Sequence, residues 1–207
     1  MSAPTDPADA SPKRRQILDA ADRIFLAHGY AAASMDAIAR RATVSKATLY
    51  AYFAGKDALF GAMVGERCCA MLARESCVAD HEAPLPEAMR RLIDFWLRFL
   101  LDPKVVATYR TVMAEGARFP DLSRAFFEAG PAQGHAWISA WIAEEQRRGR
   151  LRADLAPRMA ASQFLALLRG ELYTRIALGL ETQPTEEAIQ AEVAAATDTL
   201  LRAFAAP

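Results

Sequence analysis

The stretch SMDAIARRATVSKATLYAYFAGK, residues 34–56, decides the fold of the N-terminal region, because it reads as two short helices separated by a tight break. In its first half, apolar residues recur at helical spacing after Ser34, which is placed to act as an N-cap. A break follows at residues 42–44, and Ser45 is placed to cap a second helix. The apolar positions of the first helix are Met35, Ile38, Ala39 and Ala42. The pattern predicts a helix-turn-helix.

The second helix of this stretch has one apolar and one polar face. Val44, Leu49 and Phe53 are spaced to face the first helix. A helix N-terminus with a hydroxyl cap, a lysine and small residues suits the major groove of DNA, where early residues meet base edges and N–H groups meet phosphates. The side chains expected to stay outside are those of Lys46, Thr48, Tyr50 and Tyr52.

The run VSKATLYAYFAGKDALF, residues 44–60, resembles the V-S-x-x-T-L-Y-x-Y-F-x-x-K-x-x-L signature of the TetR family of bacterial repressors. The preceding run RRQILDAADRIFLAHGYAAASMDAIARRA is similar to the first two helices of that family, so the resemblance covers residues 13–60. The family often has glycine where this chain has Thr43. Because a positive φ strains a threonine, we expect the turn either to avoid the left-handed region or to absorb a modest cost.

The resemblance and the helix faces together predict a set of DNA contacts. We expect Lys46 and Thr48 to lie at or near base edges, and other residues of the stretch to contact phosphates; the alternative for each is an exposed side chain that contacts no DNA. Lys56 is assigned to phosphate by the resemblance. The expected phosphate contacts are Ser34, Ser45, Tyr50, Tyr52 and Lys56, joined by Lys13, Arg14 and Arg15 at the start of the first helix. One short helix gives too little contact, so specificity requires a dimer with two such helices about 34–36 Å apart.

Charge is concentrated where these contacts are expected. The 207 residues carry no formal net charge, which argues against a generally basic nucleic-acid binder. Residues 11–56 nevertheless contain eight Lys and Arg against three acidic residues, a net charge of +5. With 53% hydrophobic residues and a mean hydropathy near zero, the chain is expected to be soluble and globular, with one large or two small domains.

Several functional classes lack support in the sequence. No apolar run approaches the roughly 20 residues that span a bilayer, and no secretory signal order is present, so we expect no membrane association and a cytoplasmic location. Motifs G-x-S-x-G and H-E-x-x-H and a phosphate-cradling glycine loop are missing, and the three histidines are far apart. We therefore predict no catalytic residues, no metal and no cofactor.

The three cysteines, Cys68, Cys69 and Cys77, lie close together on one expected helix. Neither an even disulfide framework nor a C-x-x-C spacing is present, so reduced thiols are expected. The favoured interpretation is small buried hydrophobes on a linker helix, and the alternative is a redox sensor at Cys68 and Cys69.

The remaining sequence predicts an all-α protein. We expect a disordered tail at residues 1–10, a three-helix DNA-binding domain with the helix-turn-helix at 11–56, and a C-terminal helical bundle for ligand binding and dimerisation at 57–207. The first helix should run from the Ser11-Pro12 cap to Gly29, and a linker helix from Lys56 toward Cys77. The expected apolar face of the first helix is Ile17, Ala21, Ile24, Phe25 and His28.

Further helices are expected over residues 85–101, 104–115, 133–148, 157–178 and 185–204. An apolar arc on 157–178 is too wide for a helix packed on one side only, and 185–204 carries a long stripe. The spacing therefore favours an intersubunit four-helix bundle, and the resemblance implies dimerisation through the same last two helices. The stripe of the last helix is Ile189, Val193, Ala196, Thr197, Leu200 and Phe204.

A ligand site is expected among the aromatic and sulfur-bearing residues of the C-terminal region, because cavities between helices commonly hold apolar ligands. The alternative is that these residues are simply core. The candidates are Tyr109, Met113, Arg118, Trp137, Phe164, Leu168 and Tyr173, with Arg118, Glu171 or His135 as an orienting polar group. The run ARFPDLSRAFFEAGP, within residues 105–178, also resembles the AefR-type branch of the family.

The sequence thus favours a homodimeric regulator, most simply a repressor that binds a palindromic operator in double-stranded DNA and is released by a small hydrophobic or amphipathic effector. Two alternatives stay open. One is an effector-independent DNA-binding or architectural protein of the same fold, and the other is a helical enzyme with a vestigial helix-turn-helix.

Overall fold

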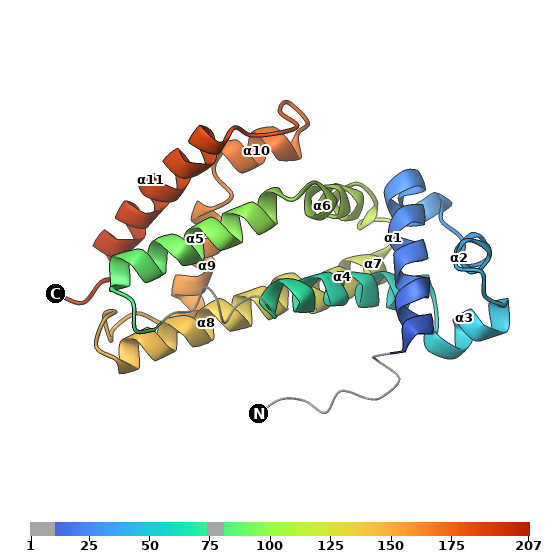
Figure 1. Ribbon diagram of the computed structural model, residues 1–207, viewed down its shortest axis with the longest axis horizontal. Helices are drawn as coiled ribbons and strands as arrows, with labels where there is room; N and C mark the ends of the chain where they lie inside the picture. The colour runs from blue at the N-terminus through green and yellow to red at the C-terminus, as the bar shows by residue number, and fades with distance from the viewer. Residues whose placement is uncertain (1–10, 74–80) are drawn as a thin grey trace. The chain divides into compact units, whose positions relative to one another are not determined.

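The computed structural model describes residues 11–73 and 81–207, and within these ranges the regular elements are helices, joined by an isolated antiparallel bridge between Leu151 and Ala205 (Figure 1). The all-α fold is confirmed. The predicted tail at residues 1–10, the linker-helix end at Cys77 and that cysteine itself lie outside the described ranges. The helices are α1 (Pro12–Ala32), α2 (Met35–Arg41), α3 (Lys46–Tyr52), α4 (Lys56–Leu72), α5 (Leu85–Leu101), α6 (Pro103–Glu115), α7 (Pro120–Ala129), α8 (Pro131–Arg147), α9 (Pro157–Leu167), α10 (Glu171–Ala177) and α11 (Glu186–Phe204).

The chain folds into two compact units. Unit 1 contains Met1–Cys68 and Ala107–Gly130, and unit 2 contains Cys69–Val106 and Pro131–Pro207. Helices α4 and α6 each begin in one unit and end in the other. The domain boundary expected after residue 56 follows the helix-turn-helix alone, whereas the end of α6 and all of α7 belong to unit 1 together with α1, α2 and α3.

Unit 1 has one apolar core built by α1, α2 and α3 with parts of α4, α6 and α7. Ile17, Ile38 and Leu49 are fully buried, which confirms the predicted inward faces of the first three helices. The prediction for His28 was wrong: its side chain is exposed, because the backbone leaves the helical conformation at Gly29, and Tyr30 takes the buried place instead.

The turn between α2 and α3 is a Schellman ending with a threonine in the left-handed position. Thr43 has φ 52°, its N–H donates to the Arg40 carbonyl at 3.1 Å, and the Val44 N–H donates to the Ala39 carbonyl at 3.0 Å. Of the two expected outcomes for Thr43, the chain therefore adopts the strained one. Gly149 ends α8 with the same hydrogen-bond pattern and φ 72°.

Unit 2 packs α5 against α10 and α11, and α8 and α11 against α9. The helix predicted over residues 85–101 is α5, and its apolar face, which includes Leu92, Trp96 and Leu97, is buried. The predicted stripe of α11 is also buried, from Ile189 to Phe204, so this face is covered by the chain's own helices.

The single helix predicted over residues 157–178 was wrong. The chain forms α9 and α10 with a break at residues 168–170, where Gly170 is the N-cap of α10 with ψ −153°. Glycine disfavours a helix interior by about 1 kcal/mol relative to alanine, and a Cβ here would lie 2.9 Å from the Glu192 carboxylate. A helix continuing through this position lacks both propensity and space.

Candidate nucleic-acid interface

Both helices of the helix-turn-helix begin at a serine that caps them. The Ser34 hydroxyl accepts the Ala37 N–H at 3.1 Å, and the Ser45 hydroxyl accepts the Thr48 N–H at 3.0 Å. Ser45 also shares a hydrogen bond of 2.7 Å with the Thr48 hydroxyl. These bonds fix the first turn of α3, and they leave its other N–H groups directed outward, where phosphate binding requires them.

Lys46 lies at the start of α3 and is exposed, as predicted. Its ammonium forms an ion pair of 2.8 Å with Asp36 of α2, a residue that the sequence reasoning did not assign. The hydrogen bond and the charge of Lys46 lower the pKa of Asp36, and the same contact raises the pKa of Lys46. Both groups are therefore charged at neutral pH. For Lys46 to contact DNA, its ion pair with Asp36 would have to break or to accommodate the DNA as a second partner.

The two tyrosines of α3 differ in environment. Tyr50 is 45% exposed and available at the surface. Tyr52 is partly buried against the core of unit 1, and its hydroxyl is 3.1 Å from the Ser11 hydroxyl at the start of α1. The expectation that Tyr52 lies wholly outside was wrong, because its ring covers Phe53 and the end of the apolar face. A DNA contact from Tyr52 would be limited to its hydroxyl edge.

Lys56 lies at the start of α4, but its ammonium is directed at the protein backbone. It donates to the carbonyl oxygens of Tyr30 at 2.6 Å and Ala33 at 3.0 Å, and it lies 4.3 Å from the centre of the Tyr30 ring. Burial lowers its pKa, while the negative charge of Glu115 acts in the opposite direction. The phosphate contact implied by the family resemblance stays a prediction, and in this structure Lys56 holds the end of α1.

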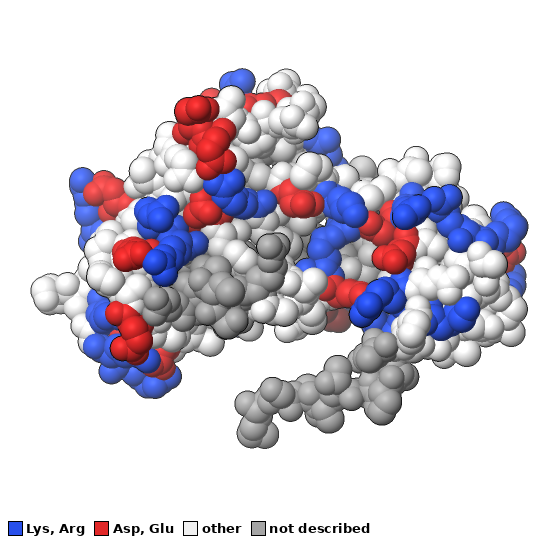
Figure 2. All heavy atoms as spheres, viewed as in Figure 1, with Lys and Arg blue, Asp and Glu red and all other residues white. Residues whose placement is uncertain are grey.

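Basic side chains surround the capped helices. Lys13 and Arg15 of α1 and Arg40 and Arg41 of α2 are exposed. Figure 2 shows several Lys and Arg side chains on the part of the surface that carries α1 to α3. Arg14 is less available, because it lies 3.6 Å from Glu66 and over the ring of Phe53. The arrangement offers a capped helix flanked by cations, which is the geometry of a DNA-reading surface.

The predicted ligand residues fall into both units. In unit 1, Tyr109 packs on Phe126 with ring centres 6.4 Å apart, whereas Met113 and Arg118 are exposed. Arg118 stacks on the neighbouring ring of Phe119. In unit 2, Phe164, Leu168 and Tyr173 are buried and Trp137 is half-buried.

An aromatic cluster of unit 2 contains a feature that the sequence reasoning passed over. Trp96 is 2% exposed, and its indole nitrogen has no hydrogen-bond partner among the described residues. The ring of Trp137 lies 6.0 Å away and that of Phe99 6.1 Å away. The other edge of the Trp96 ring fills the space at Gly134 of α8, where a Cβ would come within 2.7 Å. A buried N–H without an acceptor is costly and uncommon in native proteins.

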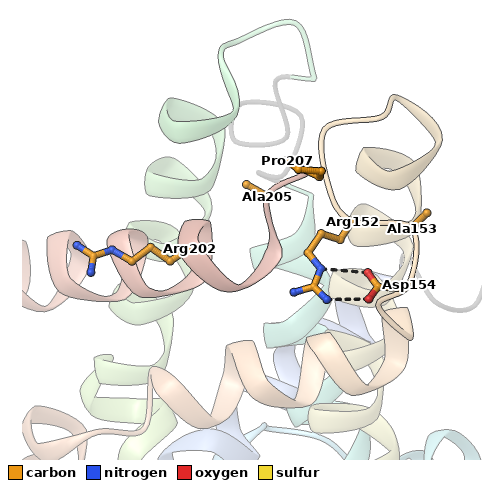
Figure 3. Close-up of a pocket in the computed structure, with 6 residues that line it drawn as sticks. All are labelled: Arg152, Ala153, Asp154, Arg202, Ala205 and Pro207. Carbon is orange, nitrogen blue, oxygen red and sulfur yellow. Dashed lines mark hydrogen bonds and ion pairs between the residues drawn. The ribbon is translucent and has the colours of Figure 1, made fainter.

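A shallow pocket of about 660 Å³ lies elsewhere in unit 2, at the C-terminal end of α11 (Figure 3). Arg152 and Asp154 line it and are bound to each other through two hydrogen bonds of 3.0 and 2.7 Å, while Arg202 extends away from them. None of the predicted ligand residues lines this pocket. Its charged groups already satisfy each other, so it offers little to a ligand.

Among the described residues, the cysteines, the possible metal ligands and the apolar helices can be compared with the predictions for a redox sensor, a metal site and a membrane span. Cys68 is buried, as expected, and its thiol donates to the Gly130 carbonyl at 3.8 Å, whereas the expectation of a buried Cys69 was wrong, because its side chain is exposed. No group of three or more His, Cys, Asp or Glu residues within residues 11–73 and 81–207 is arranged to hold a metal ion. No helix in these ranges is long and apolar enough to cross a membrane.

A capped α3 presented on a three-helix core with exposed cations defines a helix-turn-helix DNA-binding protein. Comparisons with known proteins agree. Residues 17–63 match the family described as bacterial regulatory proteins, tetR family, and residues 87–206 match the C-terminal domain of AefR-like transcriptional repressors. The chain belongs to the TetR family of DNA-binding transcriptional regulators, in its AefR-like branch.

Individual relatives support this assignment. The chain is 40% identical to a solved protein named Flavonoid-responsive Regulator FrrA, with 93% of this chain and 97% of that chain covered and a TM-score of 0.77. It is 26% identical over 165 residues to the HTH-type transcriptional regulator UidR of Escherichia coli K12, covering 77% of this chain and 78% of that protein. A regulator from Mesorhizobium loti shares the fold with a TM-score of 0.82 over 97% of this chain and all of its own, at 22% identity.

Proposed function

We propose that the protein is a cytoplasmic, homodimeric repressor, not an enzyme, which binds a palindromic operator and is released by a small hydrophobic or amphipathic effector. The observation that carries the proposal is α3, capped by Ser45 and flanked by exposed cations, in a chain that belongs to a family of DNA-binding regulators. We propose Lys46 and Thr48 for base edges, and Ser34, Ser45 and Tyr50 for phosphates.

Exposed apolar side chains support dimerisation through the C-terminal helices. The stripe of α11 is covered by the chain's own helices, so a second copy would use a different face. Met159 on α9 is 61% exposed, and Leu178 and Leu180 after α10 are each 70% exposed. Large apolar side chains left exposed on a surface commonly mark an interface. We propose that the partner copy packs against α9 and the end of α10.

For the effector we propose a flat aromatic molecule with a hydrogen-bond acceptor, of the flavonoid type. The name of the 40%-identical relative, a flavonoid-responsive regulator, supports this class. The aromatic cluster around Trp96 supports it independently, because its rings suit stacking and its buried indole N–H lacks an acceptor. A carbonyl or hydroxyl oxygen of the effector would supply that acceptor.

Release requires that the effector bind the form that does not read DNA more tightly than the form that does. Helices α4 and α6 are the elements available to connect the two events, since each runs from one unit into the other. We propose that effector binding shifts α4 and thereby the separation of the two reading heads. Structures of the free and effector-bound protein with identical head separation would contradict this mechanism.

The DNA-binding part is tested by fluorescence anisotropy with a labelled duplex from the intergenic region upstream of the protein's own gene and a scrambled duplex of equal composition. Preference for the native duplex, with affinity falling steeply as salt rises, is the expected result. Equal affinity for both duplexes over a panel of candidate promoters would favour the architectural alternative. Turnover of a bound small molecule without DNA binding would favour the enzyme.

The effector part is tested by adding the flavone apigenin, a planar molecule with carbonyl and hydroxyl acceptors, to the protein–operator complex. We expect release from the wild type, and about a tenfold higher half-release concentration for Trp96→Phe, which keeps a ring but removes the N–H. Trp141→Phe, at a buried tryptophan of α8 outside the Trp96 cluster, is the matched control. Equal release of all three proteins would show that Trp96 does not anchor the effector.

A further inference from the structure

The α1–α2 segment, residues 30–33, comprises the end of α1 after its kink at Gly29 and the residue that follows it, and it is held by a carboxylate from α6. Gly29 has φ 73° and ψ 177°, and the two peptide N–H groups that follow it both point to Glu115. The Tyr30 N–H donates to one carboxylate oxygen at 2.9 Å and the Ala31 N–H to the other at 2.6 Å. Only glycine fits before this pair, because a Cβ at residue 29 would lie 2.9 Å from Glu115 Oε1 and φ is positive.

The carbonyl groups of the same segment are held from α4. The Lys56 ammonium donates to the carbonyls of Tyr30 and Ala33 at 2.6 and 3.0 Å. Within residues 30–33, an anion therefore binds the N–H groups of Tyr30 and Ala31, and a cation binds the carbonyls of Tyr30 and Ala33. Hydrogen bonds with one charged partner are roughly twice as strong as neutral ones, so the segment is fixed in position more firmly than an ordinary turn.

This segment determines where the reading head begins. Residue 33 is followed directly by Ser34, the N-cap of α2, and α2 packs on both α1 and α3. A shift of residues 30–33 would therefore move α2, and α3 with it. The carboxylate that prevents the shift is the last residue of α6, a helix that starts at Pro103 in unit 2 and ends at Glu115 in unit 1.

A second contact attaches α6 to the same helix pair. Thr108 accepts a hydrogen bond of 2.9 Å from Arg67 of α4, and another nitrogen of that guanidinium lies 2.5 Å from Asp22 of α1. Helix α6 is thus connected to α1 at two points about two turns apart, Thr108 and Glu115. A helix held at two points can set the orientation of its neighbour.

We propose that Glu115 is a positioning residue for DNA reading, which holds residues 30–33 so that α2 and α3 present the operator-binding geometry. The inference rests on the proposed DNA-binding function. It adds that α6, and not α4 alone, sets the reading head. Any state of unit 2 that withdraws the end of α6 would release the α1–α2 segment and lower operator affinity.

The test compares Glu115→Gln and Glu115→Ala with the control Asp19→Asn, at an exposed acid of α1 in the same unit. Removing a negative charge alone should strengthen DNA binding slightly, as expected for the control. Loss of the Glu115 hydrogen bonds to Tyr30 and Ala31 should instead lower operator affinity. We expect operator affinity to fall about tenfold for Glu115→Gln, which keeps one acceptor, and about a hundredfold for Glu115→Ala, with affinity for scrambled DNA equal to that of Asp19→Asn.

Hydrogen exchange at the Tyr30 and Ala31 amides provides a second readout that needs no DNA. Faster exchange at these two amides in Glu115→Gln, with the core of α1 still protected, is the expected result, and it stays measurable if Glu115→Ala fails to fold. Wild-type protection together with operator affinity equal to that of Asp19→Asn would overturn the proposal. If the wild type itself does not distinguish operator from scrambled DNA, the proposed function fails, while the exchange data still decide whether Glu115 holds the segment.

Discussion

Each unit of the molecule uses a glutamate to join distant parts of the chain, but the two glutamates bind different partners. In unit 1, Glu115 accepts two peptide N–H groups of the α1–α2 segment. In unit 2, Glu145 of α8 is completely buried. One of its carboxylate oxygens lies 2.6 Å from His81 Nδ1, and the other accepts a hydrogen bond of 2.6 Å from Arg150 Nε. Arg150 also donates to the Ala83 carbonyl at 2.6 Å, so the pair holds the chain just before α5.

The different partners of the two glutamates predict different roles, Glu115 in positioning the DNA-binding helices and Glu145 in the stability of the fold. A carboxylate bound to backbone N–H groups holds a short segment in place and can be withdrawn without leaving a buried charge unpaired. A fully buried carboxylate bound to a guanidinium cannot be withdrawn, because its loss leaves that cation uncompensated. We therefore expect substitutions at Glu145 to affect folding and substitutions at Glu115 to affect DNA reading.

The largest expected effect is that of Glu145→Ala. It should lower the free energy of unfolding by about 3 kcal/mol, because the partly buried Arg150 loses its anion and His81 loses its hydrogen-bond partner. Urea unfolding followed by circular dichroism measures the change. Glu145→Gln, which keeps an acceptor, should lose less. If Glu145→Ala were as stable as the wild type but defective in DNA binding, the contrast between the two glutamates would be reversed.

The sequence predicted what local periodicity encodes and missed contacts between distant residues. The caps at Ser34 and Ser45 and the stripe of α11 were correct, since each depends on residues within a few turns. The two contacts of Glu115 join residues 85 and 84 positions apart, and no local pattern signals them. The unpaired Trp96 nitrogen is likewise a property of three-dimensional packing.

Two incorrect predictions, the unbroken helix over residues 157–178 and the buried His28, have causes in the local sequence. Gly170 is consistent with a break in the helix, but the apolar residues on both sides of it favoured one continuous helix. At the end of α1, glycine was read as a helix end, but the change of face after it placed Tyr30 inside and His28 outside. Periodicity predicts a face only as far as the backbone stays helical.

The second effect concerns Tyr30, the residue that both Glu115 and Lys56 contact. Burial, and after it the charges of Asp57, Asp121 and Glu115, raise the pKa of Tyr30 from 10.0 to about 12. Below pH 10 the phenol is protonated in both states and its contribution is fully present. Between pH 10 and 12 the unfolded chain ionises first, so stability falls, by about 2 kcal/mol across the window.

Tyr30→Phe removes this titration. Stability measured by urea unfolding from neutral to alkaline pH should therefore fall less steeply for the variant than for the wild type. Parallel curves for wild type and Tyr30→Phe would show that this phenol does not sense the charges around the α1–α2 segment.

The third effect compares two helix ends that have the same hydrogen bonds. Thr43→Gly in unit 1 should raise the free energy of unfolding by about 0.5–1 kcal/mol, because it relieves a left-handed threonine. Gly149→Ala in unit 2 should lower it by about 1 kcal/mol, since its φ is positive although the space around a Cβ is open. Thermal unfolding of both variants measures the pair, and changes of the same sign would contradict the strain argument.

The smallest effect is expected for Asp36→Asn, which frees Lys46 on the reading surface. Affinity for scrambled DNA should rise a few-fold, because one acidic group is removed and a cation is released. Anisotropy against scrambled and native duplexes measures the change, and their affinity ratio should fall. Asp19→Asn, which frees no lysine, is the matched control, and an equal gain in both variants would show that the Lys46 ion pair is irrelevant to DNA binding.

The central claim, that α3 reads the operator bases, is tested most directly by measuring affinity for a panel of operators with single-base substitutions, using the wild type, Lys46→Ala and Lys13→Ala. We predict that Lys46→Ala loses discrimination at one base pair in each half-site, worth about 1–3 kcal/mol, whereas Lys13→Ala weakens binding to all duplexes equally. Uniform weakening by Lys46→Ala, indistinguishable from that of Lys13→Ala, would contradict the assignment of base reading to the start of α3.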